Sequence, residues 1–138
     1  RLRPTGASTF VFATIRNSKI QNNNGYGVLS RDRTFVSIDA SNISGNLRSG
    51  VNLLTTGTIG ETVVNNSFLA DNGSVNAGSE AGVTSNGAAS FVNIMGNQII
   101  QSENGVRRIN SGHINSSGDN HVAGNTANGT TDGAVTSL

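Results

Sequence analysis

One motif recurs five times along the chain, and this repeat constrains the fold more than any other feature. A short polar residue is followed two positions later by a large apolar residue, and the apolar residues fall 23, 25, 31 and 23 positions apart: Ile20, Ile43, Phe68, Ile99 and Val122. Strand-length runs between Asn- and Gly-rich corners, repeated about every 25 residues, are typical of a solenoid in which each repeat forms one coil.

Three further sets of positions keep the register of the repeat. Five residues before the first four apolar residues lies another apolar residue: Ile15, Ile38, Val63 and Ile94. Three residues after each lies a short polar side chain: Asn23, Asn46, Asp71, Ser102 and Asn125. Gly-Val pairs follow at residues 27–28, 50–51, 82–83 and 105–106. Like residues of successive coils would then stack about 4.8 Å apart, which predicts apolar columns and ladders of asparagine amides.

These repeats resemble a known family. The stretches "IRNSKIQNNNGYGV", "IDASNISGNLRSGV", "VVNNSFLADNGSV" and "IMGNQIIQSENGV" are similar to the short repeats of right-handed parallel β-helix proteins in the pectin-lyase-like superfamily, which follow the pattern I-x-x-N-x-I-x-x-N-x-x-x-G-V. The resemblance covers about Thr9 to Asn125. The ending "SSGDNHVAGNTANGTTDGAV" resembles the closing segment of bacterial surface-type β-helix proteins. The resemblance implies a fold and is nearly silent about chemistry.

The repeat and the resemblance together predict an all-β fold, a right-handed parallel β-helix (solenoid) of about five coils in a single domain. The predicted coils cover about residues 9–30, 31–55, 56–87, 88–111 and 112–126, and residues 127–138 form a closing tail. The third coil is longer because "GSVNAGSEA" is inserted there, which predicts a loop at a corner. Nothing at the N-terminus resembles a cap, so we expect the chain to be part of a longer one or to be covered by another chain.

Composition limits the partners of such a solenoid. The formal net charge of +1, with arginines in both halves, leaves no basic stripe for nucleic acid. No apolar stretch approaches the roughly 20 residues that span a bilayer, and the absence of cysteine excludes disulfides and thiolate metal sites. We therefore expect no nucleic acid, no membrane insertion, no metal and no cofactor. The partners that remain are other protein chains, a second copy, or a polysaccharide.

The positions of the ionisable residues in the coils limit the chemistry that this chain can perform. Cleavage of a glycosidic bond needs two carboxylates about 5 to 10 Å apart across a sugar, and no two acidic residues here share a suitable position. Arg16 and Asp39 are equivalent in adjacent coils, which predicts a surface ion pair or a catalytic pair on a lyase-like groove. His113 and Asp119 are the other pair to test. Calcium-dependent pectate lyases use an Asp cluster and a basic Arg or Lys, but Lys19 is the single lysine and no acidic cluster exists, so no catalytic residue is assigned.

Alternation along the strands predicts a column of large apolar side chains on the outside of the solenoid. Its members are Phe12, Phe35, Val64, Phe91 and Met95. Such a column is covered by a loop or tail of the chain itself, contacts another protein, or binds a ligand. A facing error of one residue would instead place a member in the core.

The function that we expect is that of a non-catalytic module, secreted or on a bacterial cell surface, which acts as a rigid structural, assembly or carbohydrate-contact domain. The alternative is a fragment of a polysaccharide lyase, hydrolase or epimerase with a groove on the solenoid face. Ice binding by a flat threonine array is a third class, but only one irregular column is available for it: Thr14, Ser37, Thr62, Asn93 and Ser116. An extracellular or cell-surface location is expected in either of the first two cases.

Overall fold

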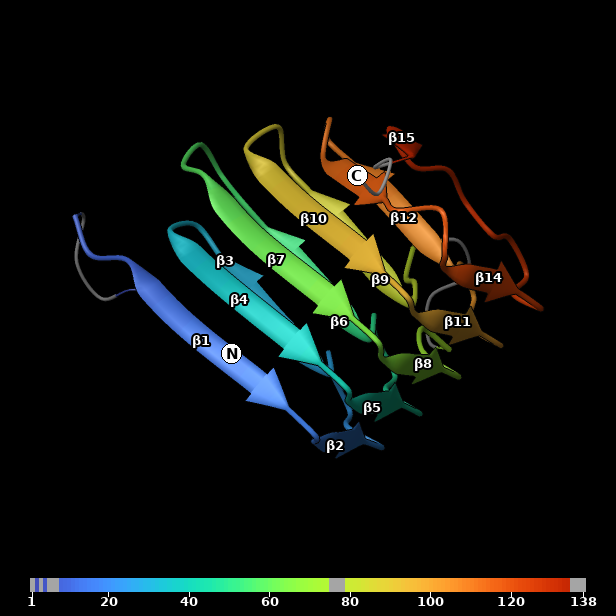
Figure 1. Cartoon of the computed structure of the whole chain (residues 1–138). Helices are drawn as coiled ribbons and strands as arrows, with labels where there is room; N and C mark the ends of the chain where they lie inside the picture. The colour runs from blue at the N-terminus through green and yellow to red at the C-terminus, as the bar shows by residue number, and fades with distance from the viewer. Residues whose placement is uncertain (1, 3, 5–7, 75–78, 135–138) are drawn as a thin grey trace.

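The strands of this chain wind into a right-handed parallel β-helix (Figure 1). The computed structural model describes residues 2, 4, 8–74 and 79–134. Within these ranges all strand pairs are parallel and no helix is present. The described part of the chain therefore contains no helix that is long and apolar enough to cross a membrane. The predicted all-β solenoid of about five coils is confirmed.

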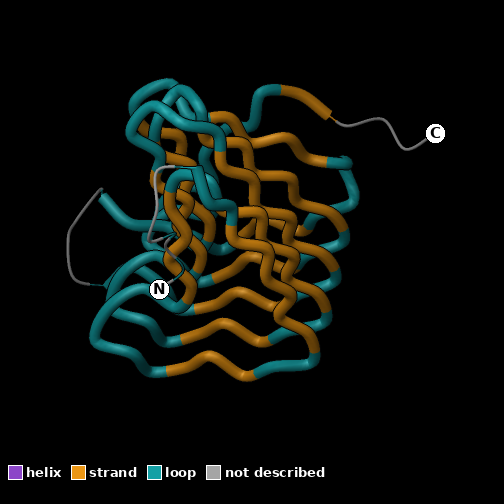
Figure 2. The backbone as a smooth tube through the Cα atoms, turned by 90° about the vertical axis from the view of Figure 1, so that its left-hand side faces the viewer, coloured by secondary structure: helices purple, strands orange, loops and turns teal. Residues whose placement is uncertain are grey.

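Three parallel sheets form the sides of the solenoid, and Figure 2 shows the coils stacked on one another. The first sheet contains, in spatial order, β1 (Val11–Arg16), β4 (Thr34–Asp39), β7 (Gly60–Asn65), β10 (Ser90–Met95), β13 (His113–Ser116) and β15 (Gly133–Ala134). The second sheet contains β2 (Lys19–Gln21), β5 (Asn42–Ser44), β8 (Phe68–Ala70), β11 (Gln98–Ile100) and β14 (His121–Ala123). The third sheet contains β3 (Val28–Arg31), β6 (Val51–Leu54), β9 (Val83–Asn86) and β12 (Val106–Ile109).

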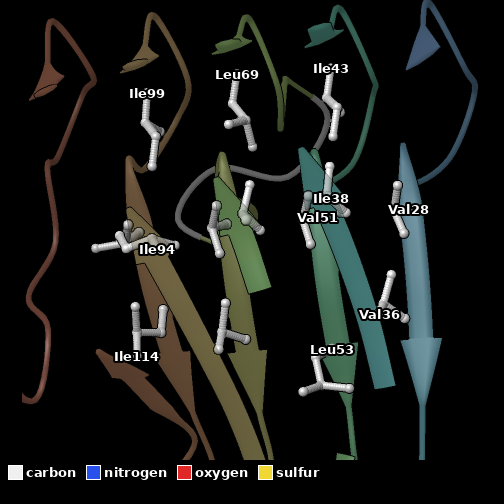
Figure 3. Close-up of a cluster of buried hydrophobic side chains, with 14 residues drawn as sticks. Val28, Val36, Ile38, Ile43, Val51, Leu53, Leu69, Ile94, Ile99 and Ile114 are labelled. Carbon is white, nitrogen blue, oxygen red and sulfur yellow. The ribbon is translucent and has the colours of Figure 1, made fainter. Parts of the chain in front are cut away.

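The core consists of columns of branched apolar side chains (Figure 3). In the second sheet Ile43, Leu69 and Ile99 come from successive coils, lie in register and are fully buried. Strands about 4.8 Å apart bring such side chains into direct contact, and each buried one contributes roughly 1.5–3 kcal/mol relative to an exposed one. Contacts between equivalent apolar residues of successive coils therefore stabilise the stack.

The third coil lies one residue away from its predicted register. Leu69, not Phe68, is the buried rung of β8, and Val64, not Val63, pairs with Ile38 in the first sheet. The side chain of Val64 is fully buried. Its predicted place on the outer face is therefore wrong.

Loop lengths explain this shift. Residues 32–33 connect β3 to β4, whereas residues 55–59 connect β6 to β7. Three more residues change the coil length from 23 residues, between the paired Ile20 and Ile43, to 26 residues, between the paired Ile43 and Leu69. The insertion falls in the connection between β8 and β9, of which residues 71–74 and 79–82 are described, while residues 75–78 lie outside the described residues.

The described end of the insertion is tied to the preceding coil through Glu80. Its buried carboxylate accepts hydrogen bonds from the Ser49 amide at 3.0 Å and the Ser49 hydroxyl at 2.6 Å. Arg48 Nε lies 3.7 Å from the other carboxylate oxygen, and the same guanidinium donates to the Tyr26 hydroxyl at 2.9 Å. Tyr26, which no other coil repeats, thus accepts a hydrogen bond from the arginine that pairs with Glu80.

Asparagine side chains form a hydrogen-bonded ladder at the corner after the second sheet. Asn23 Nδ2 donates to Asn46 Oδ1 at 2.8 Å, and Asn46 Nδ2 donates to Asn72 Oδ1 at 2.9 Å. Asn46 Nδ2 also donates to the Ile20 carbonyl at 3.2 Å. The corner position of the third coil is therefore Asn72 rather than the predicted Asp71. A second ladder, in which backbone amides donate to side-chain oxygens of the next coil, follows the preceding corner: Ser18, Ser41, Ser67, Asn97 and Asn120.

The glycines of the Gly-Val pairs occupy positions where no side chain fits. A Cβ added to Gly82 would lie 2.5 Å from Ile99 Cγ2 and 2.9 Å from the Gly105 carbonyl oxygen. Gly82→Ala should therefore lower the free energy of unfolding by about 1–3 kcal/mol through overpacking, measured by urea denaturation. Gly25→Ala is the matched control, because a Cβ added there has no neighbour within 4 Å. Equal losses in the two variants would contradict the steric explanation.

Candidate functional site

The outside of the first sheet carries aromatic, acidic and polar side chains in register. Two columns of outward-pointing side chains run across the strands of this sheet. Together these two columns are called the outer face. The aromatic column contains Phe12, Phe35, Glu61, Phe91 and His113. The polar column beside it contains Thr14, Ser37, Val63, Asn93 and Asn115.

Strand pairing stacks the rings of the aromatic column. The centroids of Phe12 and Phe35 lie 5.2 Å apart at an interplanar angle of 15°, and those of Phe91 and His113 lie 4.8 Å apart at 6°. Phe10 adds a tilted contact to Phe35 at 5.8 Å. Phe12 is 76% exposed, so its aromatic surface is available to a partner.

A carboxylate interrupts this aromatic column. Glu61 lies in register between Phe35 and Phe91, and its Oε1 accepts a hydrogen bond from Asn93 Nδ2 at 2.9 Å. Asn93 Oδ1 in turn accepts a hydrogen bond from Asn115 Nδ2 at 3.0 Å. Among the residues that the structure describes, no cationic side chain forms an ion pair with Glu61. The two amides thus orient an acidic group that lacks a counter-charge.

A groove of about 350 Å³ opens on the outer face above β1, β4 and β7. Its lining combines two phenyl rings with two hydroxyl groups and one carboxylate: Phe12, Ala13, Thr14, Phe35, Val36, Ser37, Glu61 and Val63. Apolar surface with a few convergent polar groups is the usual composition of a ligand site. The groove is the candidate binding site of this chain.

The structure distributes the predicted apolar column over three locations. Phe12, Phe35 and Phe91 share the aromatic column, Val64 lies in the core, and Met95 lies at the far end of β10. Met95 is 38% exposed and pairs with Asn65 rather than with an aromatic residue. Only the three phenylalanines therefore contribute to one continuous surface.

Sequence reasoning missed Glu61 as a residue of this surface. The predicted register of the third coil turned Gly60, Thr62 and Val64 outward, which turned Glu61 inward. The available signal was Asn72, because aligning it with Asn46 in place of Asp71 shifts the whole coil by one residue. Glu61 then faces outward between two phenylalanines.

Arg16 and Asp39 form an ion pair, with 3.3 Å between Arg16 Nε and Asp39 Oδ2. Their side chains are 64% and 26% exposed. An exposed pair of this kind contributes about 0–1 kcal/mol. Asn66 Nδ2 donates a hydrogen bond to the other oxygen of Asp39 at 3.4 Å. Both carboxylate oxygens of Asp39 are thus engaged by side chains of the solenoid itself.

His113 pairs with Asp132 and not with the predicted partner Asp119. His113 Nδ1 lies 3.6 Å from Asp132 Oδ2 at the start of β13, whereas Asp119 follows the end of that strand. Hydrogen bonds from the Ser117 hydroxyl and the Gly96 amide lower the pKa of Asp119 below its ordinary value. A lowered pKa is the opposite of what a general acid needs near neutral pH. The predicted acid–base pair is therefore not assembled.

A second pocket, of about 550 Å³, lies beside the last described coil. Its charged groups bind one another: Asp132 forms an ion pair with Arg108 and accepts a hydrogen bond from the Ile114 amide at 2.8 Å. Arg107 Nη1 donates to the Ser79 carbonyl at 2.5 Å. Asp132 thus fastens the described part of the predicted closing tail to the coil before it, while residues 135–138 lie outside the described residues.

The described residues contain no group of three His, Asp or Glu side chains that could hold a metal ion. Neither a family model, nor a curated protein, nor a solved structure matches this chain.

Proposed function

We propose that this chain is an extracellular, non-catalytic module that binds a polysaccharide along its outer face. The observation that carries the proposal is the groove in which Phe12 and Phe35 lie beside Ser37 and Glu61. Phenyl rings pack against the C–H faces of sugars. A hydroxyl group can donate hydrogen bonds to sugar hydroxyls or accept them, and a carboxylate accepts them.

Rigidity of the groove supports binding. Its side chains project from paired strands of β1, β4 and β7, so their spacing is fixed by the backbone hydrogen bonds of the sheet. A preorganised surface loses less conformational entropy when a ligand binds. A long sugar chain could follow the aromatic column across several coils.

The catalytic alternative finds less support in the groove. Of the described residues that line it, Glu61 is the only one with a carboxylate. Hydrolysis of a glycosidic bond normally needs two carboxyl groups, and a metal-dependent elimination needs a metal site. An activity of the lyase, hydrolase or epimerase type would have to use groups outside these residues.

Phe35→Ala should weaken glycan binding about 5- to 20-fold, because the ring at the centre of the aromatic contacts is lost, an effect of about 1–2 kcal/mol. The measurement is isothermal titration with oligosaccharides chosen from a glycan panel. Phe68→Ala is the matched control, since Phe68 is a partly exposed phenylalanine on β8 of the second sheet.

Two results would contradict the proposed function. Absence of binding to every glycan tested, or an equal loss in Phe68→Ala, would remove the outer face as a glycan site. Release of unsaturated uronates or reducing ends during incubation with polysaccharides would show catalysis and would contradict the non-catalytic assignment. Circular dichroism of both variants checks that the solenoid is intact.

A further inference from the structure

The carboxylate of Glu61 has one oxygen that no described residue binds. Asn93 donates to Oε1, and no hydrogen bond to Oε2 occurs within the described part of the chain. Glu61 is half-buried on β7 and lies between the rings of Phe35 and Phe91. A carboxylate among apolar rings attracts a cation more strongly than one in bulk water, because the local dielectric constant is lower.

The charges around the groove leave this carboxylate unbalanced. No Arg or Lys belongs to the described lining of the groove. Arg16 is engaged by Asp39, and Arg108 is engaged by Asp132, so neither guanidinium neutralises Glu61. Phenyl faces carry negative quadrupole density that also favours a cation within about 6 Å. The described lining of the groove thus carries one carboxylate and no cationic side chain, which favours cationic over anionic ligands.

We propose that the groove recognises a polysaccharide with free primary amino groups, that is, a polymer of N-deacetylated amino sugars, whose ammonium group pairs with Glu61. This inference rests on the proposed glycan-binding function and specifies the charge of the glycan. The ammonium group has three donors, and the free Oε2 of Glu61 and the Ser37 hydroxyl on the same groove can accept them. N-acetylation would remove the charge and add volume at this position.

The same geometry disfavours uronic-acid polymers. Their carboxylates would approach Glu61, and like charges repel one another. The charge of the groove thus separates two classes of polysaccharide that would otherwise both pack on the phenyl rings. The preference is expected to weaken as salt concentration rises, because exposed parts of the ion pair are screened.

The test compares three hexasaccharides by isothermal titration at pH 6 and low salt: a β-1,4-linked glucosamine hexamer, its fully N-acetylated counterpart and a galacturonic acid hexamer. The glucosamine hexamer should bind about tenfold more tightly than the acetylated one, which corresponds to about 1.4 kcal/mol. Glu61→Gln should remove this preference, because the affinity for the glucosamine hexamer falls to that for the acetylated one. The substitution keeps the shape of the side chain and an oxygen for Asn93.

Asp71→Asn is the matched control, because it removes the same charge from an exposed corner residue outside the groove. It should leave the preference for the amino sugar intact. The inference would be overturned if the glucosamine and acetylated hexamers bound equally, or if the galacturonic acid hexamer bound more tightly than the glucosamine hexamer. The glycan-binding function would stand in both cases. Failure of all three hexamers and of a wider glycan panel to bind would overturn both.

Discussion

Leu69→Ala should lower the free energy of unfolding by about 2–5 kcal/mol, because it opens a cavity in the middle of a buried column. Leu69 is fully buried and pairs with Ile43 on one side and Ile99 on the other. Each neighbour would lose van der Waals contacts that a rigid stack of strands cannot easily recover. Urea denaturation, followed by circular dichroism, measures the midpoint of unfolding and the slope of the unfolding free energy against urea concentration.

Phe68→Ala separates the two possible registers of the third coil. Phe68 is larger than Leu69 but only partly buried, on the outside of β8. Its truncation should cost only about 1 kcal/mol, since less apolar surface returns to water. A greater loss for Phe68→Ala than for Leu69→Ala would show that Phe68 is the core rung after all.

Asn46→Ala should lower the free energy of unfolding by about 2–4 kcal/mol, because buried groups lose their hydrogen-bond partners. Asn46 is fully buried, accepts a hydrogen bond from Asn23 Nδ2 at 2.8 Å and donates one to Asn72 Oδ1 at 2.9 Å. It also donates to the Ile20 carbonyl, which would be left without that donor. Thermal and urea unfolding of the variant measure the loss.

Asn24→Ala is the comparison for this variant. Asn24 is an exposed neighbour in the run of three asparagines, and it makes no side-chain hydrogen bond within the described residues. Its replacement should change stability by less than about 0.5 kcal/mol. Similar effects in Asn46→Ala and Asn24→Ala would mean that the amide ladder adds nothing beyond an ordinary corner.

Most of the fold could be predicted because the solenoid repeats its physical requirements in every coil. Each coil needs a glycine where another coil passes closely, and a corner amide or hydroxyl that bonds to the next coil, so these residue types recur at a readable spacing. The register of the third coil was not predicted correctly, because apolar residues occupy both candidate positions at Val63 and Val64 and at Phe68 and Leu69. Hydrophobic alternation cannot choose between two apolar neighbours.

The candidate site could be predicted in part. Alternation placed Phe12, Phe35 and Phe91 on one face, but the register error hid Glu61, the residue that gives this face its charge. The pairing of His113 with Asp132 was missed for a different reason. Asp132 comes from the segment after the last full coil, where the repeat ends and spacing no longer indicates which residues meet.

The asparagine ladder has a polarity. In the two links Asn23–Asn46 and Asn46–Asn72, the amide nitrogen of one coil donates to the amide oxygen of the next coil towards the C-terminus. Asn46 and Asn72 also donate back to the carbonyls of Ile20 and Ile43 in the coil before them. A coil that is duplicated within the stack would therefore find matching donors and acceptors on both sides without any new interaction. A contact between the N-terminal ends of two solenoids would instead set the Asn23 oxygen of one copy against that of the other, which is acceptor against acceptor.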